Sequence, residues 1–74
     1  MTAAREIVLR VVEAETGFAV EEETTLEELG LDSLDLLDLL LAIGNEAGTE
    51  LGEEQIVGVE TVADLIRLVH EAGA

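Results

Sequence analysis

Ser33 is the residue of this 74-residue chain whose type and position best suit it to take part in chemistry. It follows Asp32 and precedes a leucine-rich stretch, and Gly30 lies two residues before that aspartate. Asp and Ser both favour helix N-termini, because a short side-chain oxygen accepts a hydrogen bond from an unpaired backbone N–H in the first turn. Asp32 followed three residues later by Asp35 also resembles a capping box. Glycine permits the sharp turn that must come before such a helix. We therefore expect Ser33 to be exposed at the start of a helix.

A phosphodiester is the chemistry that suits such a serine best. The amides and the dipole of a helix N-terminus stabilise a phosphate. Nucleophilic catalysis finds no support, because the single histidine, His70, lies far along the chain and no Gly-x-Ser-x-Gly motif surrounds Ser33. No catalytic residue is therefore predicted. From the spacing alone, an unmodified N-cap serine is the simpler interpretation.

The helix that Ser33 opens is expected to run to about Ala47. At about 100° per residue, one face collects the apolar side chains of a core-facing helix: Leu36, Leu39, Leu40, Ile43 and Ala47. Leu34, Leu37 and Leu41 form a second apolar strip, which Asp35 and Asp38 border. This strip is either covered by another helix or partly exposed as a docking site. Gly44 is expected to weaken the helix by about 1 kcal/mol relative to alanine.

Two further helices and a short one complete the predicted fold. A first helix covers Thr2 to Thr16, with Ile7, Val8, Val11, Val12 and Ala14 on its apolar side. A last helix begins at Thr61-Val62, where Asp64 completes a capping box, and it carries the stripe Val62, Leu65, Ile66 and Val69. The segment from Thr49 to Val59 contains a short helical turn near 53–57 and packs through Leu51, Ile56, Val57 and Val59. The fold class is therefore all-α, a small four-helix bundle of three longer helices and one short one, in a single domain, 1–74.

A long connection from Gly17 to Leu31 joins the first two helices. It is too long to be structureless in so small a domain. Phe18 and Val20 are expected to anchor it, the run 25–28 has the spacing of a capping box, and Leu26, Leu29 and Leu31 are expected to pin it to the core. The glutamates 21–23 are most simply a solvated loop, although they could bind a divalent cation. No metal site is predicted.

The charge of −15, from 18 acidic residues against three arginines, excludes several classes of partner. We expect neither nucleic acid nor anionic membranes as partners, and the longest apolar run, 39–43, is too short to cross a bilayer. The hydrophobic content of 49% nevertheless allows a core. We expect a cytoplasmic monomer that meets partners bearing basic patches.

The run 29–35 resembles the phosphopantetheine attachment motif of acyl carrier proteins, whose core is Asp-Ser-Leu after a Leu-Gly turn. The resemblance continues without a gap through the acidic second helix, the 49–54 loop, Ile56 and Thr61-Val62. It implies that a phosphopantetheinyl transferase attaches 4′-phosphopantetheine from coenzyme A to Ser33, within the motif of Asp32 and Leu34. It also implies that acyl-loading, condensing and modifying enzymes dock on the surface formed by Asp35, Leu37, Asp38, Leu41, Glu46 and Ile56.

Departures from the usual fatty-acid carriers favour a specialised pathway, such as polyketide synthesis. Those carriers have further acids where Gly44 and Asn45 stand, an aromatic residue at Ala47, and Ile-Pro in place of residues 51–52. Two alternatives stay open. The chain could carry amino acids for peptide synthesis, or it could be an unmodified acidic helical adaptor for which Ser33 has no function.

Overall fold

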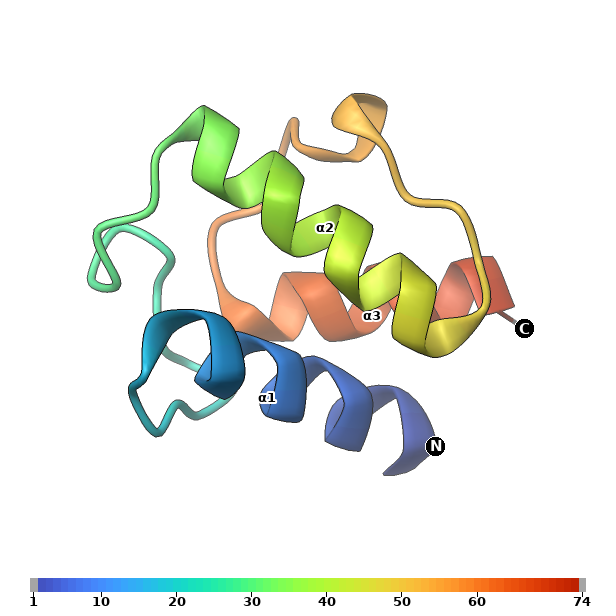
Figure 1. Ribbon diagram of the computed structural model, residues 1–74, viewed down its shortest axis with the longest axis horizontal. Coiled ribbons are helices and arrows are strands. Elements are labelled where there is room, and N and C mark those ends of the chain that lie inside the picture. Colours follow the sequence, from blue (N-terminus) through green and yellow to red (C-terminus); the bar gives the residue numbers. More distant parts are fainter. Residues whose placement is uncertain (1, 74) are drawn as a thin grey trace.

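The computed structural model describes residues 2–73, which fold into three α-helices and one 3-10 turn. The helices are α1 (Thr2–Thr16), α2 (Ser33–Ala47) and α3 (Val62–Gly73), and the turn η1 (Glu53–Gln55) lies between α2 and α3 (Figure 1). This confirms the all-α class and the predicted bounds of the first two helices. The short fourth helix is a single 3-10 turn.

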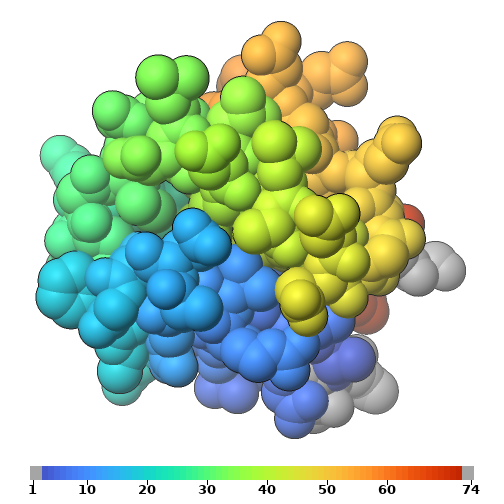
Figure 2. Space-filling view, in the orientation of Figure 1, coloured from blue at the N-terminus to red at the C-terminus, as the bar shows by residue number. Residues whose placement is uncertain are grey.

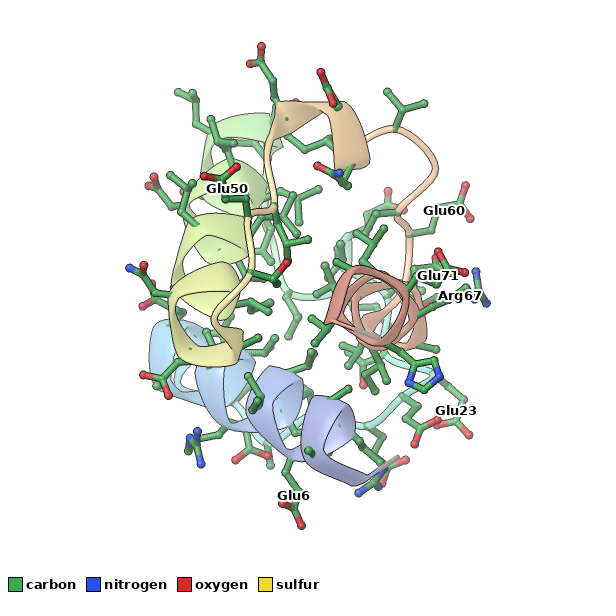
Figure 3. All side chains as sticks on the ribbon, turned by 90° about the vertical axis from the view of Figure 1, so that its right-hand side faces the viewer. Glu6, Glu23, Glu50, Glu60, Arg67 and Glu71 are labelled. Atoms are coloured by element: carbon green, nitrogen blue, oxygen red, sulfur yellow. The ribbon has the colours of Figure 1, made fainter. Side chains whose placement is uncertain are left out.

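The apolar faces of the three helices meet in one aliphatic core. Viewed from the side, side chains from all three helices point into the space between them (Figure 3). Its most completely buried members are Val8, Val12, Leu39, Leu40, Ile43, Val62 and Leu65. Helix α1 packs more extensively against α2 and α3 than those two helices pack against each other. The segment after α2 supplies further core residues. Leu51 is buried, and Ile56 and Val59 pack against the core.

The connection between α1 and α2 is held against the start of α3 by backbone hydrogen bonds. Thr25 and Thr61 form an antiparallel bridge, flanked by bonds from the Leu26 N–H to the Glu60 carbonyl (2.9 Å) and from the Val62 N–H to the Thr24 carbonyl (3.0 Å). The predicted turn at 25–28 is confirmed, because the Thr25 and Glu28 side chains each accept from the other's backbone N–H. Val20 and Leu26 are buried as expected. The bridge therefore fixes the loop that leads to Ser33.

Three predicted core positions are wrong. Phe18 is 59% exposed and Val57 is 87% exposed, and Ala14 is also exposed. Phe18 follows Gly17 (φ 79°), and Val57 precedes Gly58 (φ 89°), so both lie beside left-handed turns. In such irregular segments, no regular period indicates which side chain faces inward.

Gly44 also departs from expectation. It is buried, and a Cβ built on it would lie 2.6 Å from the Thr49 carbonyl oxygen. The chain after α2 therefore crosses directly over this glycine. The sequence indicated a weak point of the helix here. The structure instead requires glycine at this position, because two backbone segments approach each other too closely for a Cβ.

Asp64 secures the start of α3 and the segment before it. Its Oδ2 accepts hydrogen bonds from the backbone N–H groups of Glu60 (2.9 Å) and Thr61 (3.1 Å), while the Thr61 hydroxyl accepts from the Asp64 N–H. The capping box predicted here is confirmed. The bonds from Glu60 and Thr61 hold the pKa of Asp64 below its ordinary value of 3.8, because they stabilise the carboxylate form.

The Asp64→Asn variant is therefore expected to be less stable than the parent at pH 7, by about 1 kcal/mol. A carboxylate whose pKa is lowered by folding stabilises the protein above its unfolded pKa, and this contribution is lost as the pH falls through the folded pKa. The difference between the two proteins should accordingly shrink below about pH 4. Urea unfolding of both proteins between pH 7 and pH 3 measures it. A difference that does not change with pH would show that the charge of Asp64 has no part in stability.

Candidate functional site

The N-terminus of α2 is capped by Asp32 and not by Ser33. The Asp32 Oδ1 accepts a hydrogen bond from the Asp35 N–H at 2.9 Å, and the Asp35 Oδ2 accepts one from the Asp32 N–H at 3.5 Å. Asp32 has extended backbone angles (φ −99°, ψ −171°), as an N-cap residue should. Because this capping box uses the two aspartates, the interpretation of Ser33 as an N-cap is wrong.

Ser33 is the first residue of α2, and it is exposed. The chain reaches it through a turn in which Gly30 has a positive φ of 75°. In this turn, the N–H groups of Gly30 and Leu31 donate to the carbonyls of Glu27 (3.0 Å) and Leu26 (3.3 Å). The serine therefore sits on a fixed backbone. Its hydroxyl lies at a helix N-terminus, where the dipole favours a phosphate.

An open groove of about 580 Å³ begins at Ser33. Its lining comes from three parts of the chain: the end of the first connection, the first turn of α2 and the segment before α3. The lining residues are Thr25, Leu26, Glu27, Leu31, Asp32, Ser33, Leu36, Val59 and Glu60. The Thr25–Thr61 bridge holds two of these parts together. The site thus combines an exposed hydroxyl with a partly apolar surface next to it.

The second strip of α2 is exposed for most of its length. Leu34 is 73% exposed and Leu41 52%, whereas Leu37 is half-buried; Asp35 and Asp38 are exposed beside them. The segment 53–58 lies alongside α2 (Figures 1 and 2). The structure thus answers the open question about this strip, because no other helix covers Leu34 or Leu41.

Glu46 and Ile56 differ from the other predicted docking residues. The Glu46 Oε1 accepts a hydrogen bond from the Arg10 guanidinium at 3.1 Å, which joins the end of α2 to α1. Ile56 is half-buried against the core. Glu46 is therefore partly neutralised, and Ile56 offers only part of its side chain to a partner.

Near Ser33 and α2, the sequence did not predict the groove or the exposure of Val57. The groove depends on residues 25–27 lying next to residues 59–60, and no local pattern indicates such a contact. Leu26 and Leu31 were predicted only as anchors of the loop. Val57 was assigned to the core because it is apolar.

Acidic residues greatly outnumber basic ones, 18 against three. Three ion pairs join Arg5 to Glu22, Arg10 to Glu46 and Arg67 to Asp64, so every arginine is paired.

Within residues 2–73, no group of three acidic or histidine side chains is placed to hold a metal ion. In the same part of the chain, no helix is long and apolar enough to cross a membrane.

This chain is similar in sequence and in fold to known proteins. Residues 6–69 match the family model described as a phosphopantetheine attachment site. An acyl carrier protein of Zymomonas mobilis is 31% identical over 90% of this chain and 86% of its own length. Another, of Coprothermobacter proteolyticus, is 36% identical over 84% of this chain and 82% of its own length. The crystal structure of an acyl carrier protein from Thermotoga maritima superposes with a TM-score of 0.76, at 28% identity, over 96% of this chain and 87% of that one.

Proposed function

This chain belongs to the acyl carrier protein family, and we propose that it carries its phosphopantetheine on the hydroxyl of Ser33. The observation that carries the proposal is the capping box of Asp32 and Asp35, which leaves an exposed serine at the first position of α2. Ser33 is also the only serine of the chain. Asp32 and Leu34 would form the motif that the transferase recognises.

The residues around Ser33 fit 4′-phosphopantetheine, the prosthetic group of the family. A helix N-terminus accommodates the phosphate, and the exposed hydroxyl is accessible to a transferase. When bound, the group supplies a terminal thiol that holds an acyl chain as a thioester. The chain itself contains no cysteine, so it depends on the prosthetic group for this chemistry. The protein positions its cargo and presents it to other enzymes; it is a carrier and not a catalyst.

Acyl carrier proteins interact with phosphopantetheinyl transferases and with biosynthetic enzymes. We place the docking surface of this chain on α2, where exposed Leu34 and Leu41 alternate with the carboxylates of Asp35 and Asp38. Leu37, Glu46 and Ile56 lie at its edges. Partners with basic patches complement this surface, and a cytoplasmic monomer is the form in which we expect it to act. The neutral side chain of Asn45, which is exposed beside Glu46, favours polyketide or related synthesis over general fatty-acid synthesis.

The proposal is tested by incubating the protein with coenzyme A and a broad-specificity phosphopantetheinyl transferase. We expect the intact mass to rise by one phosphopantetheinyl group. Because the chain has no cysteine, a thiol reagent should detect no thiol before the reaction and one per chain after it. A folded protein that gains neither mass nor thiol, beside a carrier that does, would favour the acidic adaptor instead.

Initial rates in the same assay locate the docking surface. Asp38→Asn removes an exposed carboxylate from α2, and we expect it to slow modification roughly two- to fivefold at low ionic strength. Glu46→Gln is the matched control, because Arg10 already compensates that carboxylate; it should change the rate less. Equal rates for both variants would place the docking surface elsewhere.

A further inference from the structure

We infer that the groove beside Ser33 selects cargo by charge, so that uncharged acyl chains lie in it and acyl groups ending in a carboxylate remain in solvent. The inference rests on the proposed attachment at Ser33. It goes further by assigning a specificity role to Glu27 and Glu60. Neither residue belongs to the attachment motif or to the docking surface on α2.

The groove lies next to Ser33 and has an aliphatic lining. Ser33 is part of its wall, so the phosphopantetheine arm on this serine starts at its mouth, and an arm that folds back lays the acyl chain over the groove. Four aliphatic side chains line the interior, namely Leu26, Leu31, Leu36 and Val59. Of these, Leu26 and Leu36 belong to the buried core, and Leu31 and Val59 pack against it. An apolar chain gains free energy by covering such side chains.

The groove is bordered by negative charge. All three charged residues that line it are acidic: Asp32, Glu27 and Glu60. The bond from the Leu26 N–H to the Glu60 carbonyl (2.9 Å) joins the two segments that bear Glu27 and Glu60, and both residues line the groove. A carboxylate at the end of the cargo would lose hydration there and meet like charges.

The arginines do not relieve this repulsion. None of the three lines the groove, and each is paired with another carboxylate. Arg67 is the one to consider, because it lies on the same side of the molecule as Glu60 (Figure 3). Its guanidinium donates to Asp64 at 3.2 Å. No cation among the groove-lining residues is therefore available to pair with an anionic cargo.

The test uses three six-carbon cargoes loaded by the transferase from their coenzyme A thioesters: hexanoyl, adipoyl and the monomethyl ester of adipoyl. Intact mass verifies each loading. A protein that does not load counts against attachment at Ser33, and this outcome is distinguished from a loaded protein whose cargo stays out of the groove. Methyl NMR shifts of Leu26, Leu36 and Val59, relative to the chain with unacylated phosphopantetheine, report occupancy of the groove. We expect clear shifts with hexanoyl and the methyl ester, and an occupancy lower by on the order of tenfold with adipoyl at pH 7.

Two double variants decide whether the carboxylates are the cause. Glu27→Gln with Glu60→Gln should move the adipoyl shifts part of the way towards those of the methyl ester, because the like charges of these two residues are removed while Asp32 and the hydration cost of the cargo carboxylate remain. Glu6→Gln with Glu13→Gln removes the same number of charges from exposed positions of α1, outside the groove, and should leave adipoyl excluded. Equal shifts for all three cargoes, no shifts for any, or rescue by both double variants would each overturn the inference.

Discussion

The Ser33→Ala variant is expected to gain neither mass nor thiol when it is incubated with coenzyme A and a phosphopantetheinyl transferase. The reaction joins the phosphate of the arm to a side-chain oxygen, and this substitution removes the only serine oxygen of the chain. The expected loss is complete, because no neighbouring group can replace the hydroxyl at the start of α2. Intact mass spectrometry and a thiol assay measure it directly.

The same variant should remain folded, which separates loss of the site from loss of structure. Asp32 and Asp35 make the capping bonds of α2, so the serine hydroxyl is not needed to begin the helix. Alanine is also a good helix former. Its thermal unfolding should stay within about 0.5 kcal/mol of the parent. A mass gain in Ser33→Ala would move the attachment to a threonine and disprove the assignment.

Gly44→Ala is expected to destabilise the protein by about 1–3 kcal/mol, the usual cost of inserting a group into a filled space. Helix propensity alone predicts the opposite, a gain of about 1 kcal/mol. The structure reverses the sign because the new Cβ would lie 2.6 Å from the Thr49 carbonyl oxygen. This oxygen belongs to the backbone, so α2 and the following segment would have to move apart. Thermal or urea unfolding measures the change.

Gly52→Ala is the matched control for this substitution. Gly52 lies in the same segment, but a Cβ there would come no closer than 4.0 Å to the Gln55 side chain, and its φ of −135° suits any residue. Alanine at this position should be neutral or stabilising, by up to about 1 kcal/mol, since it restricts the unfolded chain. If both variants unfold alike, the close approach at Gly44 does not govern stability.

The helices could be predicted because their signals are local. Leu36, Leu39, Leu40 and Ile43 recur at the helical period and are all buried, since the geometry of one helix decides which residues share a face. The capping boxes at Asp32 and at Thr61 span only three residues each. The exposure of Ser33 follows from the same short-range rules. The Asp-Ser-Leu motif then suggested what that serine carries.

The remaining features depend on contacts between distant residues. Phe18 and Val57 are apolar but exposed, because irregular segments have no period. Arg10 and Glu46 are 36 residues apart in sequence, and only the packing of α1 on α2 brings them together. Such pairs leave no pattern in a single sequence.

The sequence by itself determined the three helices, the capped turn before α2 and the serine at its start, since each depends on residues within a few positions of one another. Only the tertiary structure decided that Gly44 must be small, that Glu46 is paired, and that Glu27 and Glu60 line the same groove as Ser33. These three results come from segments that approach one another only when the core forms. The attachment serine is therefore a local feature of the chain, whereas the groove that surrounds it is a product of the whole fold.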